Sequence, residues 1–158
     1  MTGHRSPFQP MSKSFRLKAF TLVEILLTIS LFVIMLSFTL PAYVNYQNRV
    51  DLDAAVTLTA QAIRTAVTLS DASYGDTNWG VHLTTSGVTL FKGTTYATRD
   101  TTEDQLYSFP RTTTIGGIND ITFSRLYGLP SQTGSITFNV NSLNTQITLN
   151  GKSQIQYQ

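Results

Sequence analysis

The longest apolar run in the chain extends from Phe20 to Leu40, and it holds no glycine, no proline and a single charged residue, Glu24. As an α-helix, this run would span about 31 Å at about 1.5 Å per residue. That length matches the hydrocarbon core of a bilayer, which is about 30 Å thick. The pattern therefore predicts a membrane-spanning helix near the amino terminus.

The helical pattern continues after the apolar run, but in amphipathic form. Pro41 is expected to interrupt and kink the helix, because proline removes one backbone donor and clashes with the preceding turn. From Asn45 to Tyr74, apolar and small residues recur at helical spacing and predict one wall of a globular core. This stripe comprises Leu52, Ala55, Val56, Thr59, Ala62, Ile63, Ala66 and Val67.

After Gly75 the period changes to an alternation of apolar and polar residues, which is typical of β-strands. The predicted strands are Trp79–Leu83, Val88–Phe91, Gln105–Phe109, Ile121–Arg125, Ser135–Val140, Thr145–Leu149 and Ser153–Tyr157. The first two are expected to form a hairpin and the last three a meander. The fold class is therefore α+β, with a long amino-terminal helix packed on a small antiparallel β-sheet domain.

These patterns divide the 158 residues into four segments. Residues 1–19 are a leader, residues 20–44 a transmembrane and assembly helix, residues 45–74 an amphipathic helix, and residues 75–158 a β-rich globular domain. The chain has no cysteine, so the stability of the domain must come from packing and from neighbouring subunits.

The distribution of charge orients the predicted span. Four basic residues, Arg5, Lys13, Arg16 and Lys18, precede Phe20, and no acidic residue does. An excess of positive charge before the span predicts a single-pass protein of the cytoplasmic membrane, with its amino terminus in the cytoplasm and its carboxyl-terminal domain outside. Removing these four from the 11 basic residues leaves 7 against 9 acidic ones, which argues against nucleic-acid binding through phosphate contacts.

The leader has two candidate starts. Met1 begins a polar stretch of ten residues with no pattern of a folded element. Met11 would begin a compact leader, MSKSFRLKA, and the sequence leaves both starts open.

A specific motif marks the junction of the leader and the apolar run. Arg16, Lys18 and the small residue Ala19 are followed by Phe20 in the sequence FTLVE, which ends at Glu24. This pattern resembles the processing site of type IV prepilins and type II secretion pseudopilins. The resemblance implies that a membrane aspartyl peptidase cuts between Ala19 and Phe20 and methylates the new amine. It also implies that Glu24 is the assembly glutamate, although the family usually has glycine where this chain has Ala19.

The resemblance has a physical rationale and implies a set of partners. The amine created by cleavage and the glutamate of a neighbouring subunit are each costly in lipid, but together they form one neutral pair. The order of strands after Trp79 is similar to that of minor pseudopilins of the GspH/FimT type, so the implied fold is pilin-like. The implied partners are other pilin or pseudopilin subunits, the prepilin peptidase and the inner-membrane assembly platform, and the implied final location is an envelope-spanning or surface filament.

Other interpretations stay open at this point. The apolar run is long for a secretory signal peptide, but small residues at Ser37 and Thr39 have the spacing of a signal-peptidase site. An uncleaved membrane anchor is a further alternative. At the level of function, the alternatives are a true type IV pilus subunit for adhesion, motility or DNA uptake, and a membrane-anchored binding domain that does not polymerise.

The inventory of catalytic residues does not favour an enzyme, and no cofactor is expected. The chain has no cysteine and only two histidines, His4 and His82. A catalytic site needs a nucleophile or an acid–base group supported by a partner. His4 lies in the leader, and His82 lies in a predicted strand, where we expect it to face solvent without a partner.

An acidic cluster in the sequence TRDTTEDQ is the other candidate for chemistry. Asp100, Glu103 and Asp104 are potential oxygen ligands for calcium, but their spacing matches no EF-hand loop. We expect a solvated loop rather than a metal site, with Arg99 and Arg111 available to pair with the carboxylates. The threonine-rich stretches around it are typical of exposed strands and loops, and nothing in their sequence supports glycosylation.

Processing at the motif is directly testable. We expect the intact mass of protein from membranes to show loss of residues 1–19 and a methyl group on Phe20, in cells that possess the peptidase. A mature terminus at Leu40, or an uncut leader in such cells, would contradict the prepilin interpretation.

Overall fold

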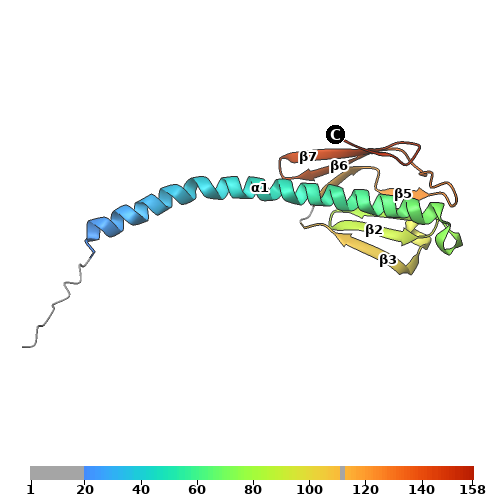
Figure 1. Cartoon of the computed structure of the whole chain (residues 1–158), viewed down its shortest axis with the longest axis horizontal. Coiled ribbons are helices and arrows are strands. Elements are labelled where there is room, and N and C mark those ends of the chain that lie inside the picture. Colours follow the sequence, from blue (N-terminus) through green and yellow to red (C-terminus); the bar gives the residue numbers. More distant parts are fainter. Residues whose placement is uncertain (1–19, 111–112) are drawn as a thin grey trace, which may run out of the picture. The chain divides into compact units, whose positions relative to one another are not determined.

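The protein is described here by a computed structural model in which residues 20–110 and 113–158 are placed. Its main elements lie in the order helix and then strands (Figure 1). They are α1 (Leu22–Asp71), β1 (Trp79–Thr84), β2 (Gly87–Lys92), β3 (Asp100–Ser108), β4 (Thr114–Gly117), β5 (Asp120–Phe123), β6 (Gly134–Val140), β7 (Leu143–Leu149) and β8 (Ile155–Tyr157), with short 3₁₀ turns η1 (Tyr74–Asp76) and η2 (Tyr96–Thr98). The chain divides between Leu40 and Pro41 into two compact units.

α1 continues through Pro41 without a break in secondary structure. The missing amide donor of Pro41 therefore does not end the helix. The kink expected at Pro41 stays a prediction.

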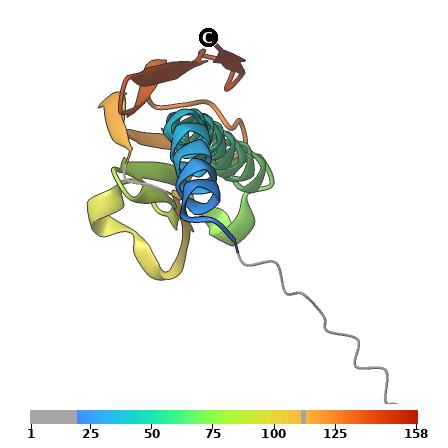
Figure 2. The same ribbon diagram turned by 90° about the vertical axis from the view of Figure 1, so that its left-hand side faces the viewer.

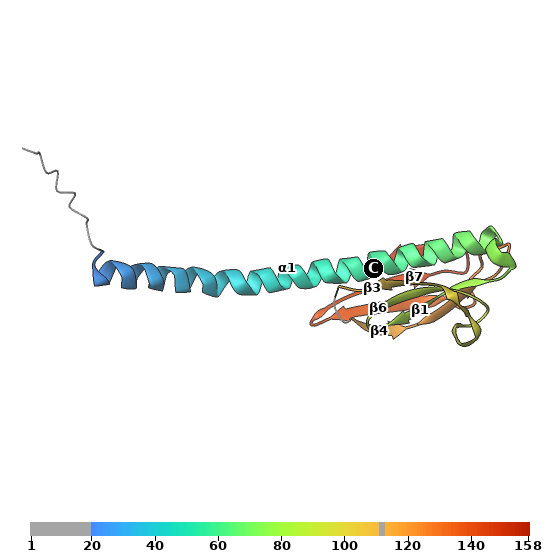
Figure 3. The same cartoon turned by 90° about the horizontal axis from the view of Figure 1, so that it is seen from below.

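The unit from Pro41 onward is a helix on two antiparallel sheets. One sheet has the strand order β3-β2-β1-β5 and the other the order β4-β6-β7-β8. The carboxyl-terminal half of α1 lies along one side of both sheets (Figures 1 and 3). Figure 2 shows the second sheet, coloured orange to red, apart from the green and yellow strands of the first. The α+β class is confirmed, and the small sheet expected from the sequence is in fact a pair of sheets.

The two predicted pairings are confirmed. β1 and β2 form the expected hairpin, with Val81 opposite Leu90. β6, β7 and β8 form the expected meander, with Ile136 opposite Ile147. Both pairings join strands that are adjacent in the sequence, where short turns and alternating patterns determine the register.

Two features of the sheets were not predicted. β3 begins at Asp100, so the acidic stretch is a strand and not a loop. β4 was missed because its sequence contains Gly116 and Gly117, which are read as a turn. Gly117 has φ 84°, and a Cβ atom there would lie 2.0 Å from the carbonyl oxygen of Ser135 on β6, so only glycine fits this end of the strand.

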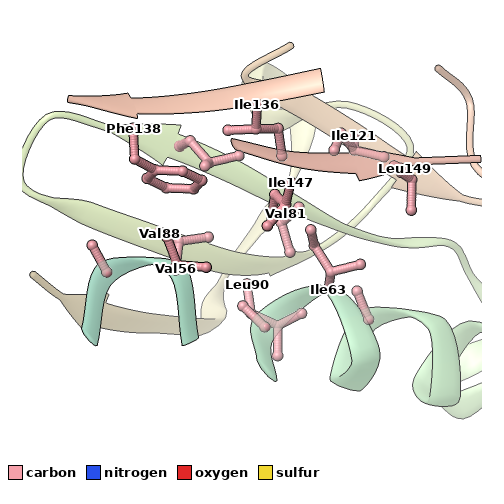
Figure 4. Packing of buried hydrophobic residues seen from close by; sticks show 14 of the residues in the cluster. Val56, Ile63, Val81, Val88, Leu90, Ile121, Ile136, Phe138, Ile147 and Leu149 are labelled. Atoms are coloured by element: carbon pink, nitrogen blue, oxygen red, sulfur yellow. The ribbon is translucent and has the colours of Figure 1, made fainter. Parts of the chain in front are cut away.

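The apolar stripe of α1 and the two sheets share one core (Figure 4). The predicted strands contribute several residues to this core, among them Trp79, Val81, Leu90, Phe123, Ile136 and Phe138. Thr59 is buried in the stripe, and its hydroxyl donates to the carbonyl of Ala55 at 2.9 Å, which satisfies it inside the helix. Phe91 is fully buried but lies outside this core cluster, because it neighbours Leu90 on β2 and successive side chains point to opposite faces of a strand.

The shared core predicts how the domain responds to truncation and mutation. A fragment from Asn45 to Gln158 should be a soluble monomer that melts cooperatively with mixed helical and strand circular dichroism. In it, Ile63→Ala should lower the free energy of unfolding by about 2 to 5 kcal/mol, because Ile63 is fully buried between helix and sheets. The matched control, Leu106→Ala on the exposed face of β3, should change it by less than about 0.5 kcal/mol. Equal effects of the two variants in denaturant titrations would show that helix and sheets do not share a core.

Candidate functional site

Thr21 determines where the apolar helix begins. The backbone amide of Glu24 donates to the Thr21 hydroxyl at 3.2 Å, and the amides of Glu24 and Ile25 also reach the Thr21 carbonyl, at 3.1 and 3.2 Å. Thr21 is therefore the N-cap of α1 and Glu24 occupies the third helical position, as in the first half of a capping box. The sequence signal for this role is a threonine three residues before a glutamate, which the motif-based reasoning did not use.

The apolar side chains that follow are exposed. Between Leu22 and Phe38, the large apolar residues have exposed fractions from 49% to 77%. The segment is long and apolar enough to cross a membrane, and its most apolar window is not buried within the described residues. A core helix of a soluble protein would be covered by its own fold, and exposed apolar surface of this extent is rare on soluble monomers. By length and composition, the segment can therefore cross a membrane.

The polar groups of this segment differ in how they are satisfied. The hydroxyls of Thr28, Ser30 and Ser37 donate to carbonyl oxygens three or four residues earlier, at 2.8 to 2.9 Å. Such bonds hide the hydroxyls within the helix itself. The Glu24 carboxylate forms no ion pair within residues 20–110 and 113–158. Its predicted partner, the amine of another subunit, stays a prediction, and Ala19 lies outside the described residues.

His82 is not the solvent-facing histidine that the sequence predicted. Its Nδ1 atom lies 2.6 Å from Oδ1 of Asp120, and its side chain is only 18% exposed. Its ring also stacks on Tyr96, with ring centres 3.7 Å apart and planes 14° apart. Tertiary contacts explain why His82 is covered. β5 pairs with β1 and places Asp120 opposite His82, and the turn after β2 places Tyr96 on the His82 ring.

Arg99 covers the other face of Tyr96. Its guanidinium carbon lies 3.7 Å from the ring centre. His82 lies at the same distance, and two groups cannot occupy one face of a ring at that separation, so Tyr96 is held between them. Arg99 Nε also donates to both carboxylate oxygens of Asp104, at 3.1 and 2.8 Å, and Nη1 donates to the Tyr96 carbonyl at 2.8 Å. The bond to Asp104 raises the pKa of Arg99 above its usual range.

The acidic cluster lies at the start of β3, and two of its members, Asp100 and Asp104, have separate partners. Asp104 pairs with Arg99, which is one of the two arginines expected to pair with the carboxylates. The other, Arg111, lies outside the described residues. Asp100 accepts hydrogen bonds from the hydroxyl and the amide of Thr102, at 2.6 and 3.1 Å, and these bonds lower the pKa of Asp100. In the part of the chain that is described, no three histidine or acidic side chains are grouped as metal ligands.

A pocket opens beside the Tyr96 stack. It has a volume of about 440 Å³, which is within the range of small-molecule sites. Its lining includes Tyr96 and its neighbours, together with Asp120 and Gln132. Sequence reasoning missed this pocket because its walls come from three segments, around residues 91–97, 120–122 and 131–132, that only tertiary folding brings together.

A scan against models of known protein families, a search of curated proteins and a search of solved structures found no match. The function is therefore inferred from the motif around Phe20, from the exposed apolar helix and from the geometry of the domain.

The Tyr96 stack makes a testable prediction about the order of the turn that contains it. Tyr96→Leu removes the ring contacts with His82, Arg99 and Phe91. Amide hydrogens of residues 93–99 should therefore exchange about tenfold faster, measured by mass spectrometry on the whole protein. Tyr127→Leu, at a 73% exposed position in another loop, is the control and should leave the exchange of residues 93–99 unchanged. Unchanged exchange in Tyr96→Leu would show that the stack does not order the turn.

Proposed function

We propose that this protein is a structural subunit of a pilin-type filament, namely a minor pseudopilin of a type II secretion system or a related assembly. After removal of residues 1–19, the helix of residues 20–44 would anchor it in the cytoplasmic membrane and later pack against neighbouring subunits. The domain after Pro41 would lie outside the cytoplasm. The observation that carries the proposal is an exposed apolar helix with one carboxylate, Glu24, joined to a domain that has its own core.

Charge supports a role for Glu24 in assembly. A lone carboxylate within a membrane segment costs about 2.5 to 3.5 kcal/mol at the helix centre on insertion scales, and less near an end. The amine of a processed Phe20 would be a second isolated charge, and it would stand at the positive end of the helix dipole. Pairing Glu24 of one subunit with Phe20 of the next relieves both costs, and it does so only when subunits assemble.

Glu24 also stands at the third helical position, where a glutamate side chain completes a capping box, although in this structure only its backbone amide bonds to Thr21. Glutamate and glutamine serve equally well three residues after a threonine N-cap. Glu24→Gln therefore keeps the capping pattern and removes the charge, whereas Glu24→Leu removes both. A requirement for the charge predicts that both variants fail in the same way.

Two other functions remain candidates with the same anchor. A true type IV pilus subunit would share the helix and the processing motif, and the genes next to this one would distinguish it through a retraction ATPase. A membrane-anchored binding domain that does not polymerise is favoured by one observation, the pocket beside Tyr96. Filament incorporation separates this last candidate from the first two.

The decisive experiment is co-assembly with wild-type neighbours. Glu24→Leu and Glu24→Gln should each insert in the membrane with a protease-resistant domain, but enter sheared filaments at least about tenfold less than wild type, because each leaves the partner amine unpaired. Quantitative mass spectrometry of the filaments measures the ratio. Glu103→Gln, on β3, is the matched control and should enter normally.

The outcomes separate the two roles of Glu24. Normal incorporation of both variants would overturn the assembly role. Failure of Glu24→Leu with normal incorporation of Glu24→Gln would assign the effect to helix capping and not to charge pairing.

A further inference from the structure

The pocket beside Tyr96 is lined by apolar residues, called its floor, and by polar residues, called its rim. The floor comprises Phe91, which is fully buried outside the main core, Tyr96 and Ala97. The rim carries the carboxylate of Asp120 and the amide of Gln132. The remaining lining residues are hydroxyl-bearing, namely Thr94, Thr95, Thr122 and Ser131. The pocket thus offers neutral and acidic hydrogen-bonding groups around a hydrophobic base.

The walls are held in place before any ligand binds. Gln132 Nε2 donates to the carbonyl of Asp120 at 3.1 Å, which fixes the amide group at the rim. Ser131 and Thr122 are joined twice, through Ser131 N to Thr122 O at 2.7 Å and Thr122 N to Ser131 Oγ at 3.1 Å. Tyr96, which also lines the pocket, is held between His82 and Arg99. A preformed site of this kind does not lose binding energy to ordering its own side chains.

At Asp120 and Gln132, the free hydrogen-bonding capacity of the rim is mainly that of acceptors. Asp120 uses Oδ1 for His82, and its Oδ2 atom makes no hydrogen bond within the described residues. Gln132 uses its amide nitrogen for the Asp120 carbonyl. Its side-chain oxygen makes no hydrogen bond within the described residues and can accept one. Among the described residues that line the pocket there is no lysine or arginine, so the site has no partner for a phosphate or carboxylate ligand.

From these features we infer that the pocket binds a neutral sugar residue, as a free sugar or as part of a glycan. Sugar hydroxyls are the donors that the Asp120 carboxylate and the Gln132 oxygen can accept. The C–H face of a pyranose ring is apolar and would lie against Tyr96 and Ala97, the apolar lining residues that are accessible. The alternative occupant, a small amine, would use the charge of Asp120 but leave the amide and hydroxyl groups of the rim without partners.

This inference does not depend on the filament proposal, since it concerns only the domain after Pro41. The test uses the full chain in dodecylphosphocholine, because detergents with sugar head groups would occupy the site. Saturation-transfer NMR is recorded with glucose, galactose, mannose and N-acetylglucosamine in turn. At least one should bind saturably with a Kd of about 1 mM, as befits a single small ligand.

The variants decide whether binding occurs in this pocket. Gln132→Ala and Asp120→Asn should each weaken binding at least about tenfold, because each removes an acceptor from the rim. Gln146→Ala, on the other sheet, is the matched control and should bind like wild type. Unchanged melting temperatures establish that the variants are folded, and if Asp120→Asn unfolds, Gln132→Ala decides.

Three results would overturn the inference. One is the absence of saturable binding by all four sugars, and another is equal binding by Gln132→Ala and wild type. The third is displacement of the bound sugar signal by putrescine with loss of binding only in Asp120→Asn, which would identify the pocket as an amine site.

Discussion

The need to satisfy an exposed apolar helix is the constraint on which the rest of this protein depends. Large side chains from Leu22 to Phe38 are open to their surroundings, and within the described residues nothing covers the most apolar window. Only a helix satisfies its backbone groups without outside partners, and the hydroxyls of Thr28, Ser30 and Ser37 follow the same rule by bonding to their own helix. Among the described side chains of this segment, the Glu24 carboxylate departs from this self-sufficiency, since the capping bond to Thr21 involves the backbone amide of Glu24 and not its carboxylate.

The second half of α1, unlike the exposed first half, is covered on one side, because it packs against both sheets. Small residues on the stripe, Ala55, Ala62 and Ala66, are fully buried and keep the helix close to the strands. Larger residues such as Ile63 belong to the core that α1 shares with both sheets. With no cysteine in the chain, this packing is the source of domain stability, and that explains why a single buried truncation should be costly.

The outer face of the first sheet has its own organisation, separate from the main core. Phe91 and Tyr96 meet edge to face with ring centres 5.5 Å apart, and Tyr96 is clamped between His82 and Arg99. A turn held by so many contacts exceeds what a plain connection between β2 and β3 requires. Its ordered side chains line the pocket beside Tyr96.

The sequence by itself determined the elements that depend on near neighbours. The apolar run, the amphipathic stripe around Ile63, the β1–β2 hairpin and the final meander all follow from local period and turn composition, which act over a few residues. Only the tertiary structure decided that the strands form two sheets, that Asp100 begins a strand, and that His82 meets Asp120 and Tyr96. These pairings join segments distant in the chain, and their free energy comes from packing and hydrogen bonds that no local pattern records, so the pocket could emerge only from the folded domain.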